Sequence, residues 1–318
     1  MAKPVKEFEV HPYVQFMMDR YSPYKKWIES EGVPIIGGAF VKDVRTEKLG
    51  YWKRKECKGA ICAFSDQMVA DAYIAEIDPG KSTKPQRQLY EEIITVAAGR
   101  GATTIWYEGT AKRTFEWERG STFAIPLNAW HQHFNGSGRE PARYVAVTNA
   151  PPTMDIIHNE EFIFNCPYNF TDRYGGAEKY FNQGLKRYED GMQHIWETNF
   201  ISDIQTASVD KREVKGAGVG ITQFEISGNS LIGHLATWPA ARYHKAHYHG
   251  AGAVIMSASD QPGGLLGLDM YSDGSGAEGI IFPAGGSACP AGRRGTRLPV
   301  VEPGATVCES VPLDFFIR

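Results

Sequence analysis

Two histidines lie close together in a short stretch that is punctuated by glycine and proline. His131 and His133 are separated by one residue, and the stretch from Gly120 to Asn135 is typical of a strand, a tight turn near Pro126 and a second strand. Because side chains alternate across a strand, both imidazoles are expected on the same face. Imidazoles that point the same way form a metal-liganding arrangement, so we expect chemistry here.

The spacing around these histidines is that of a known motif. The motif consists, in order, of a glycine, five residues, a proline, a turn residue two places on, a histidine and an asparagine. These positions are filled by Gly120, Pro126, Asn128, His131 and Asn135. This pattern resembles the second motif of the cupin superfamily, which usually has glycine in place of Asn128. Asparagine tolerates the left-handed backbone of such a turn, so the exchange is mild.

The first cupin motif is expected upstream, and its spacing is present. Its positions are filled by Gly80, Gln86, Gln88, Glu92 and Gly99. Glutamines therefore stand where the family usually has two histidines. The resemblance covers residues 66–150 and implies an all-β fold, which hosts many different chemistries in this family.

The resemblance places several polar side chains in one cavity of the first half. A strand through 86–92 and the later histidine strand would together contribute Gln86, Gln88, Tyr90, Glu92, His131 and His133. In a first interpretation Glu92, His131 and His133 bind a divalent metal, with Gln88 as a weak fourth ligand. In a second, the amides and His131 bind a neutral or anionic organic ligand, and in a third the groups satisfy one another in a structural core.

A cofactor and candidate roles follow from the metal interpretation. Two histidines and one carboxylate favour non-haem Fe(II), with Mn, Ni or Zn as other candidates. A glutamine amide is a poor ligand for these metals, which argues against the full affinity of a cupin site. The candidate proton-transfer groups are Tyr90 and His133, and the candidate substrate-binding residues are Gln86, Gln88, Trp106, Trp117 and Arg143.

The candidate residues and the resemblance to cupins are compatible with three classes of function. Similarity in architecture to gentisate dioxygenases and other bicupins implies a metal-dependent oxygenase that acts on a small aromatic or carboxylate-bearing compound. The second class is a non-catalytic, storage-like bicupin that binds a small ligand. The third is a metal-assisted isomerase or lyase, in which Tyr90 or His133 moves a proton.

The densest histidine cluster lies in the second half of the chain. His244, His247 and His249 fall close together, and the last two share a strand face, so they are a second candidate metal site. This pair repeats the spacing of the two glutamines about half a chain later, which indicates a duplication and hence a bicupin. The glutamate and the later histidine of a cupin site are missing here, so we predict a degenerate barrel.

Hydrophobic periodicity predicts the elements that position these residues. Short strands separated by turns fill residues 70–150 and resume after residue 218, which is typical of an all-β barrel or sandwich. Apolar residues at three- and four-residue spacing predict a short helix within 11–30 and a long helix over 177–200. The expected organisation is an N-terminal helical arm (1–65), a first cupin jelly-roll barrel (66–150), a helical connector (151–215) and a second, degenerate barrel (216–318).

The composition indicates which kinds of partner are expected. The 318 residues carry 34 basic and 37 acidic side chains, a net charge of -3, without a long run of like charge or an apolar stretch of membrane-spanning length. A small molecule is therefore the expected partner, and nucleic acid and membrane are not. Five cysteines without a C-x-x-C pair and a charged N-terminus without an apolar region predict a cytoplasmic protein. The resemblance to cupins implies a homodimer or a higher homo-oligomer.

Overall fold

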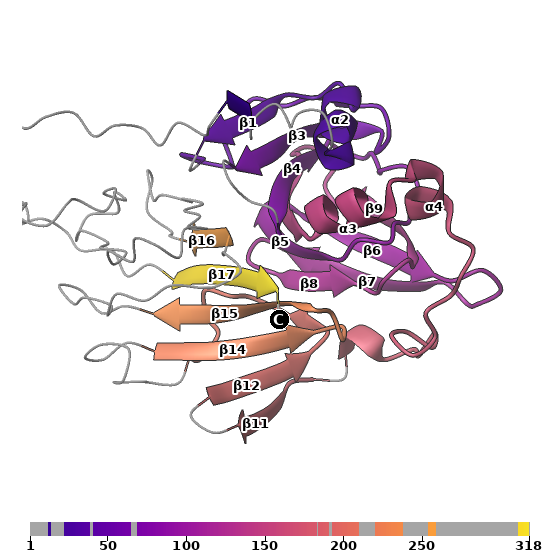
Figure 1. Cartoon of the computed structure of the whole chain (residues 1–318). Helices are drawn as coiled ribbons and strands as arrows, with labels where there is room; N and C mark the ends of the chain where they lie inside the picture. Colours follow the sequence, from indigo (N-terminus) through magenta and orange to yellow (C-terminus); the bar gives the residue numbers. More distant parts are fainter. Residues whose placement is uncertain are drawn as a thin grey trace, which may run out of the picture.

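The fold is built mainly from β-strands, which form three sheets (Figure 1). The structure is a computed structural model that describes residues 12–13, 22–38, 41–64, 69–182, 184–190, 193–209, 220–237, 254–258 and 311–317. Within these ranges no helix combines the length and the apolar character needed to cross a membrane. The all-β class expected from the sequence is confirmed, although the described sheets are open and do not close into barrels.

The largest sheet has eight strands and comes mostly from the first half of the chain. In spatial order they are β1 (Ile35–Gly38), β3 (Cys57–Phe64), β4 (Asp71–Ile77), β10 (Ala142–Thr148), β5 (Glu92–Ala98), β8 (Thr122–Ile125) and β13 (Phe200–Ile201), with β2 (Gly50–Trp52) paired to β3. The strands β4 and β5 are rich in β-branched and aromatic residues and are buried on both faces. The sheet is therefore covered on two sides.

A three-stranded sheet covers the inner face of the eight-stranded sheet. It consists of β7 (Arg113–Glu118), β6 (Arg100–Trp106) and β9 (Trp130–Asn135). Burial alternates along all three strands, so one face points inward and the other outward. Asn128 adopts a φ of 58° in the turn between β8 and β9, as expected for the residue that replaces the usual glycine of the motif.

A six-stranded sheet from the second half covers the outer face. In order it contains β11 (Lys186–Asp190), β12 (Gln193–Thr198), β14 (Gly220–Ile226), β15 (Leu231–Thr237), β17 (Val311–Ile317) and β16 (Val254–Ala258). An apolar core between this sheet and the eight-stranded sheet includes Ile74, Ile93, Val145, Phe224, Leu231 and Leu235. Hydrophobic burial thus joins the two halves of the chain.

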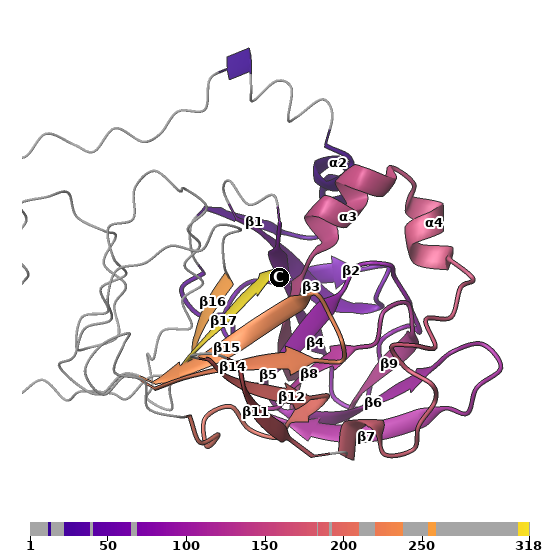
Figure 2. The same ribbon diagram turned by 60° about the horizontal axis from the view of Figure 1, so that its bottom comes forward.

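Three short α-helices lie at one end of the eight-stranded sheet (Figure 2). They are α2 (Pro23–Ser30), α3 (Ala150–Ile157) and α4 (Glu160–Asn165), and a 3-10 turn, η1, spans Tyr180–Asn182. The Ser22 side chain caps α2 by accepting from the Lys25 amide, and Asp155 of α3 accepts from the Tyr24 amide. Within the predicted range 11–30 the structure has α2, which begins at Pro23 and is docked on α3, whereas residues 14–21 lie outside the described residues.

The long helix predicted over 177–200 is wrong. This segment contains η1, β11, β12 and the start of β13. Its aromatic residues suit strands as well as helices, and β12 pairs with both β11 and β14. Trp196 on β12 is buried in the core between the two large sheets, so sheet pairing overrides the local helical periodicity.

Candidate metal centre

Glu92, His131 and His133 meet between the eight-stranded and the three-stranded sheets. Glu92 begins β5, and the two histidines occupy inward positions of β9. All three side chains are at most 1% exposed, and one potential ligand atom from each lies within 4.8 Å of the others. The structure therefore brings together the three residues that the sequence predicts as metal ligands.

His131 presents a lone pair to this cluster. Its Nδ1 lies 3.1 Å from the carbonyl oxygen of Ala129, which can only accept, so Nδ1 carries the proton. Burial lowers the pKa of His131, although the charge of Glu92 opposes this shift, so the ring is neutral at pH 7. The Nε2 lone pair then faces the Glu92 Oε1 atom at 3.4 Å.

His133 is oriented by a hydrogen-bonded pair of side chains. Its Nδ1 lies 2.7 Å from the Thr103 hydroxyl, which also accepts from the Trp117 indole at 2.8 Å. Its Nε2 is buried and has no hydrogen-bond partner. Burial lowers the pKa of His133 well below its usual value, and the nearby His131, which would repel a second charged ring, and Lys55 act in the same direction. This ring is also neutral and can offer Nε2 as a ligand.

Glu92 is held at one oxygen and left without a hydrogen bond at the other. Its Oε2 accepts from the Tyr73 hydroxyl at 2.7 Å, and its buried Oε1 has no hydrogen-bond partner. Burial raises the pKa of Tyr73 well above its usual value, so this hydroxyl keeps its proton and donates. The buried Lys55 ammonium lies 3.3 Å from the same hydroxyl.

These three side chains fit a divalent cation. The three side chains bring one potential ligand atom each within 4.8 Å of one another, and Glu92 Oε1 and His133 Nε2 are buried without a hydrogen-bond partner among the described residues. Such burial costs free energy, which a bound cation would offset. Two imidazole nitrogens and one carboxylate are also the donor set of many non-haem Fe(II) sites. The partners Tyr73, Ala129 and Thr103 orient the ligands, as second-sphere groups do in metal proteins.

Four residues of this centre were not predicted from the sequence. Lys55 belongs to a charged stretch that is typical of a surface, and Tyr73 and Tyr144 belong to apolar strands that are typical of a core. Thr103 lies at an inward position of β6, paired in register with His133. Tyr144 is buried, and its ring lies 5.1 Å from that of His133. Only pairing between distant strands shows that they meet.

The predicted strand through 86–92 is wrong, because the regular strand begins at Glu92. Gln86 instead forms an isolated bridge with His131, and its Nε2 lies 3.2 Å from the His131 Nε2. Pro85 offers no amide hydrogen, which hinders a regular ladder in this segment. Gln88 is buried, and Tyr90 packs against Trp27 and Phe164.

The other predicted binding residues have different surroundings. Trp106 lies on the outward face of the three-stranded sheet and stacks on Trp130, and Trp117 orients His133 through Thr103. Arg143 is paired with Glu76 at 2.6 Å, on the face of β10 opposite Tyr144. Trp106 and Arg143 therefore do not face the cluster.

The second predicted metal site, formed by His244, His247 and His249, lies outside the described residues. The degenerate second barrel predicted for 216–318 is described only in part, by β14 to β17. These parts of the sequence interpretation stay predictions.

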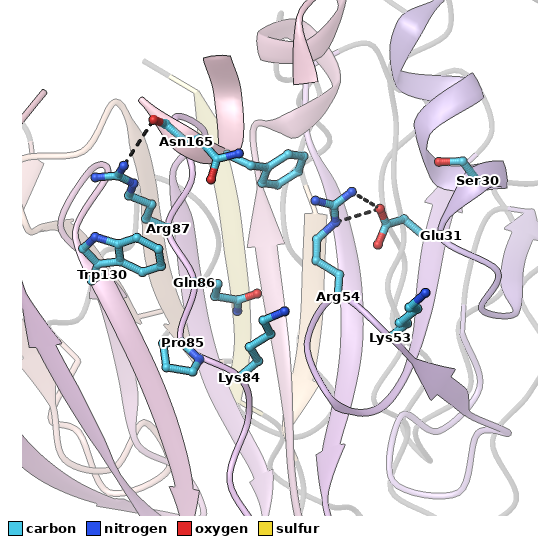
Figure 3. Close-up of a pocket in the computed structure, with 11 residues that line it drawn as sticks. Ser30, Glu31, Lys53, Arg54, Lys84, Pro85, Gln86, Arg87, Trp130 and Asn165 are labelled. Atoms are coloured by element: carbon cyan, nitrogen blue, oxygen red, sulfur yellow. Dashed lines mark hydrogen bonds and ion pairs between the residues drawn. The ribbon is translucent and has the colours of Figure 1, made fainter. Parts of the chain in front are cut away.

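A pocket of about 480 Å³ adjoins the cluster (Figure 3). Gln86 lines this pocket and also contacts His131, so one amide separates the pocket from the candidate ligands. Figure 3 shows Arg87 beside Trp130 on one side, and Arg54 paired with Glu31 on the other.

Comparison with known proteins supports the fold. No family model matches the chain. A solved structure of oxalate decarboxylase matches 100% of this chain and 86% of its own, with 12% identity and a TM-score of 0.51. Oxalate oxidase in complex with glycolate is 24% identical over 25% of this chain and 41% of its own, with a TM-score of 0.24. The cupin domain of Cnp3 from Schizosaccharomyces pombe is 16% identical over 34% of this chain and 71% of its own, with a TM-score of 0.28.

The full-length likeness to oxalate decarboxylase agrees with the two motifs of the first half. The chain has the all-β fold of a bicupin, with two sheet-forming halves in tandem. At 12% identity this likeness concerns the fold alone.

Proposed function

We propose that the chain is a metal-dependent enzyme of the cupin fold that acts on a small organic molecule at Glu92, His131 and His133. The observation that supports this most strongly is the convergence of three buried potential ligands, of which Glu92 Oε1 and His133 Nε2 have no hydrogen-bond partner among the described residues. The donor set favours Fe(II) and a dioxygenase-like reaction, with Mn, Ni or Zn as other candidates. The bound ion would supply Lewis acidity and, in the case of iron, redox chemistry.

The protein residues bind and orient in this proposal. Tyr73 holds Glu92, the Ala129 carbonyl holds His131, and Thr103 holds His133. Because the pKa values of both histidines are lowered by burial, protons do not compete for their Nε2 atoms at neutral pH. Burial of the whole cluster excludes bulk water and strengthens each electrostatic contact.

One observation favours a second function, binding of an organic ligand without a metal. The Gln86 amide lies 3.2 Å from His131 Nε2 and can donate to its lone pair. This lone pair can serve the amide or a metal ion, but not both. The glutamine therefore lowers the affinity for metal, which would suit a non-catalytic bicupin. The third alternative is an isomerase or lyase, in which a neutral His133 would accept a proton.

Metal analysis tests the proposal. Full-length protein purified without chelator should retain stoichiometric metal, and His131→Ala should lose the share that binds at this cluster. The difference in metal content between the two proteins is the metal bound at this cluster, as distinct from metal bound by His244, His247 and His249. The matched control is His158→Asn, because His158 is an exposed histidine in a left-handed position at the end of α3 that asparagine tolerates.

The same proteins distinguish the function classes. Oxygen uptake with a panel of small carboxylates and phenols, present in wild type and in His158→Asn but absent in His131→Ala, would support the oxygenase. Turnover without oxygen uptake would favour an isomerase or lyase. Equal metal content in wild type and His131→Ala, after loading with Fe(II), Mn(II), Ni(II) or Zn(II), would overturn the proposed centre.

A further inference from the structure

The pocket beside the metal cluster is strongly cationic. Four of its lining residues carry a positive charge and one carries a negative charge: Lys53, Arg54, Lys84 and Arg87 against Glu31. The chain as a whole is slightly acidic, with a net charge of -3, so the cations are concentrated here against the general trend. Such a concentration raises the local potential for an anion.

The acidic residue of the pocket is already engaged. Glu31 accepts from the Arg54 guanidinium at 2.5 Å and from the Trp52 indole at 2.6 Å. Within the described part of the chain, Lys53, Lys84 and Arg87 form no ion pair with a carboxylate. Three cations of the pocket therefore have no carboxylate partner among the described residues.

Arg87 is held in place and still has an unused donor. Its guanidinium lies 4.7 Å above the ring of Trp130, and its Nη2 donates to the Asn165 carbonyl at 3.1 Å. Its Nε is shielded from solvent and has no hydrogen-bond partner in the described part of the chain, and the same holds for the Trp130 indole nitrogen. A guanidinium fixed by an aromatic ring is suited to bind a carboxylate or phosphate, since little conformational freedom is lost on binding.

The opposite side of the pocket repeats this arrangement. The Arg54 guanidinium lies 4.0 Å above the ring of Phe164 and is fixed by its pair with Glu31. The pocket thus has two arginines on aromatic rings, with Lys84 and Gln86 between them (Figure 3). Because Arg54 is paired with Glu31, the cation on that side without a carboxylate partner among the described residues is Lys53. Lys53 on one side and Arg87 on the other suit a ligand that carries more than one negative charge.

The volume of the pocket is sufficient for a small organic molecule. About 480 Å³ lies within the usual range for sites that bind small organic molecules, roughly 300 to 1,000 Å³. A two-carbon acid would leave most of this space empty. Since Gln86 adjoins both the pocket and His131, a ligand held here lies next to the candidate metal ligands.

We infer that the pocket binds an organic dianion larger than a two-carbon acid, and that Arg87 and Lys84 hold one of its anionic groups. This inference rests on the proposed function, because it names the substrate class of the same site. Gln86 forms the partition between the bound anion and the metal cluster.

Binding of a matched series of probes to the full chain tests the inference. Phthalate, benzoate and benzamide have similar size and carry two, one and no negative charges. Wild-type protein should bind phthalate at least about tenfold more tightly than benzamide, with benzoate between them, as measured by calorimetry at low salt. Phenyl phosphate, included as a second dianion, distinguishes a carboxylate site from a phosphate site.

Two variants and a control assign the effect to the pocket. Arg87→Gln and Lys84→Gln should each weaken phthalate binding about tenfold or more and leave benzamide unchanged. Lys112→Gln is the control, because Lys112 is an exposed lysine above the ring of Trp106, outside the pocket. Equal binding of phthalate and benzamide to wild type would overturn the inference, as would undiminished phthalate binding to folded Arg87→Gln, Lys84→Gln double-variant protein.

Metal content measured on the same samples separates this inference from the proposed function. Phthalate binding that persists while wild type and His131→Ala contain equal metal would support the anion pocket and overturn the metal centre. Metal that is lost only in His131→Ala, together with no preference for phthalate, would support the metal centre and overturn the anion pocket. Circular dichroism of each variant shows whether it is folded.

Discussion

Two neighbouring glutamates of the molecule have opposite surroundings. Glu91 and Glu92 are both buried, at 4% and 0% exposure. Glu91 accepts hydrogen bonds at both oxygens, from Asn149, Arg173, Ser230 and Leu231. Glu92 accepts one hydrogen bond, from Tyr73, and its second oxygen has none. Since successive residues of an extended chain point to opposite faces, one glutamate faces the second half of the chain and the other faces the metal cluster.

This difference separates a structural carboxylate from a candidate metal ligand. The amides of Ser230 and Leu231 lie at the start of β15, so Glu91 ties the six-stranded sheet to the strand that carries the candidate ligand. A buried carboxylate with all its acceptor sites used contributes to stability. A buried carboxylate with a free oxygen costs stability in the protein alone, and a bound cation offsets that cost.

Removing the candidate metal ligand should have the largest effect on metal. Glu92→Gln replaces a charged ligand by a poor neutral one, so we expect the variant to lose the metal at this cluster during gel filtration. The free energy of unfolding of the metal-free protein should change by about 1 kcal/mol or less. Metal analysis and urea unfolding of the same sample measure both. Retained metal would show that Glu92 is not a ligand.

Removing the structural glutamate should have the largest effect on stability. Glu91→Ala leaves Arg173 and four other donors without their acceptor, so we expect a loss of about 3–5 kcal/mol in the free energy of unfolding. Urea unfolding monitored by tryptophan fluorescence measures it. The metal content of the molecules that remain folded should be that of wild type. A loss below about 1 kcal/mol would contradict the structural role of Glu91.

A third buried carboxylate extends the comparison to pH. Asp71 accepts from the Phe64 amide, and burial raises its pKa from 3.8 to about 7. Because the folded state binds this proton more tightly than the unfolded state, the stability it contributes is full below pH 3.8 and is lost as the pH rises through about 7. The difference in unfolding free energy between wild type and Asp71→Asn should therefore fall by about 1.4 kcal/mol per pH unit in that window and level off above it. A difference that is constant with pH would contradict the raised pKa.

The smallest expected effect concerns the group that orients Glu92. Tyr73→Phe removes the hydroxyl that donates to Glu92 Oε2, so the carboxylate loses its fixed orientation. We expect metal affinity to fall roughly 10- to 100-fold, as is typical for second-sphere partners. Competition with a fluorescent chelator measures it, and Tyr51→Phe, at an exposed tyrosine, is the control. Equal affinity in the two variants would remove Tyr73 from the centre.

The spacing of the motifs was sufficient for the fold class and for the three candidate ligands. Glycine and asparagine at turns depend on local backbone conformation, and the shared face of His131 and His133 follows from the two-residue period of a strand. These are properties of short segments, so they can be predicted from the sequence. The strands within 177–200 were predicted as a helix, because aromatic residues at mixed spacing suit a helix or a strand. The pairing of β12 with β14 makes this segment a strand.

The sequence by itself indicated Glu92, His131 and His133 as candidate ligands, together with Gln88 and three histidines outside the described residues, because residue type and strand period are local. The tertiary structure alone decided how each ligand is held and what lies beside it. Tyr73 reaches Glu92 from β4, Thr103 reaches His133 from β6, and the pocket cations come from segments far apart in the chain. Hydrogen bonds between strands depend on register and sheet order, which hydrophobic burial of the whole fold selects.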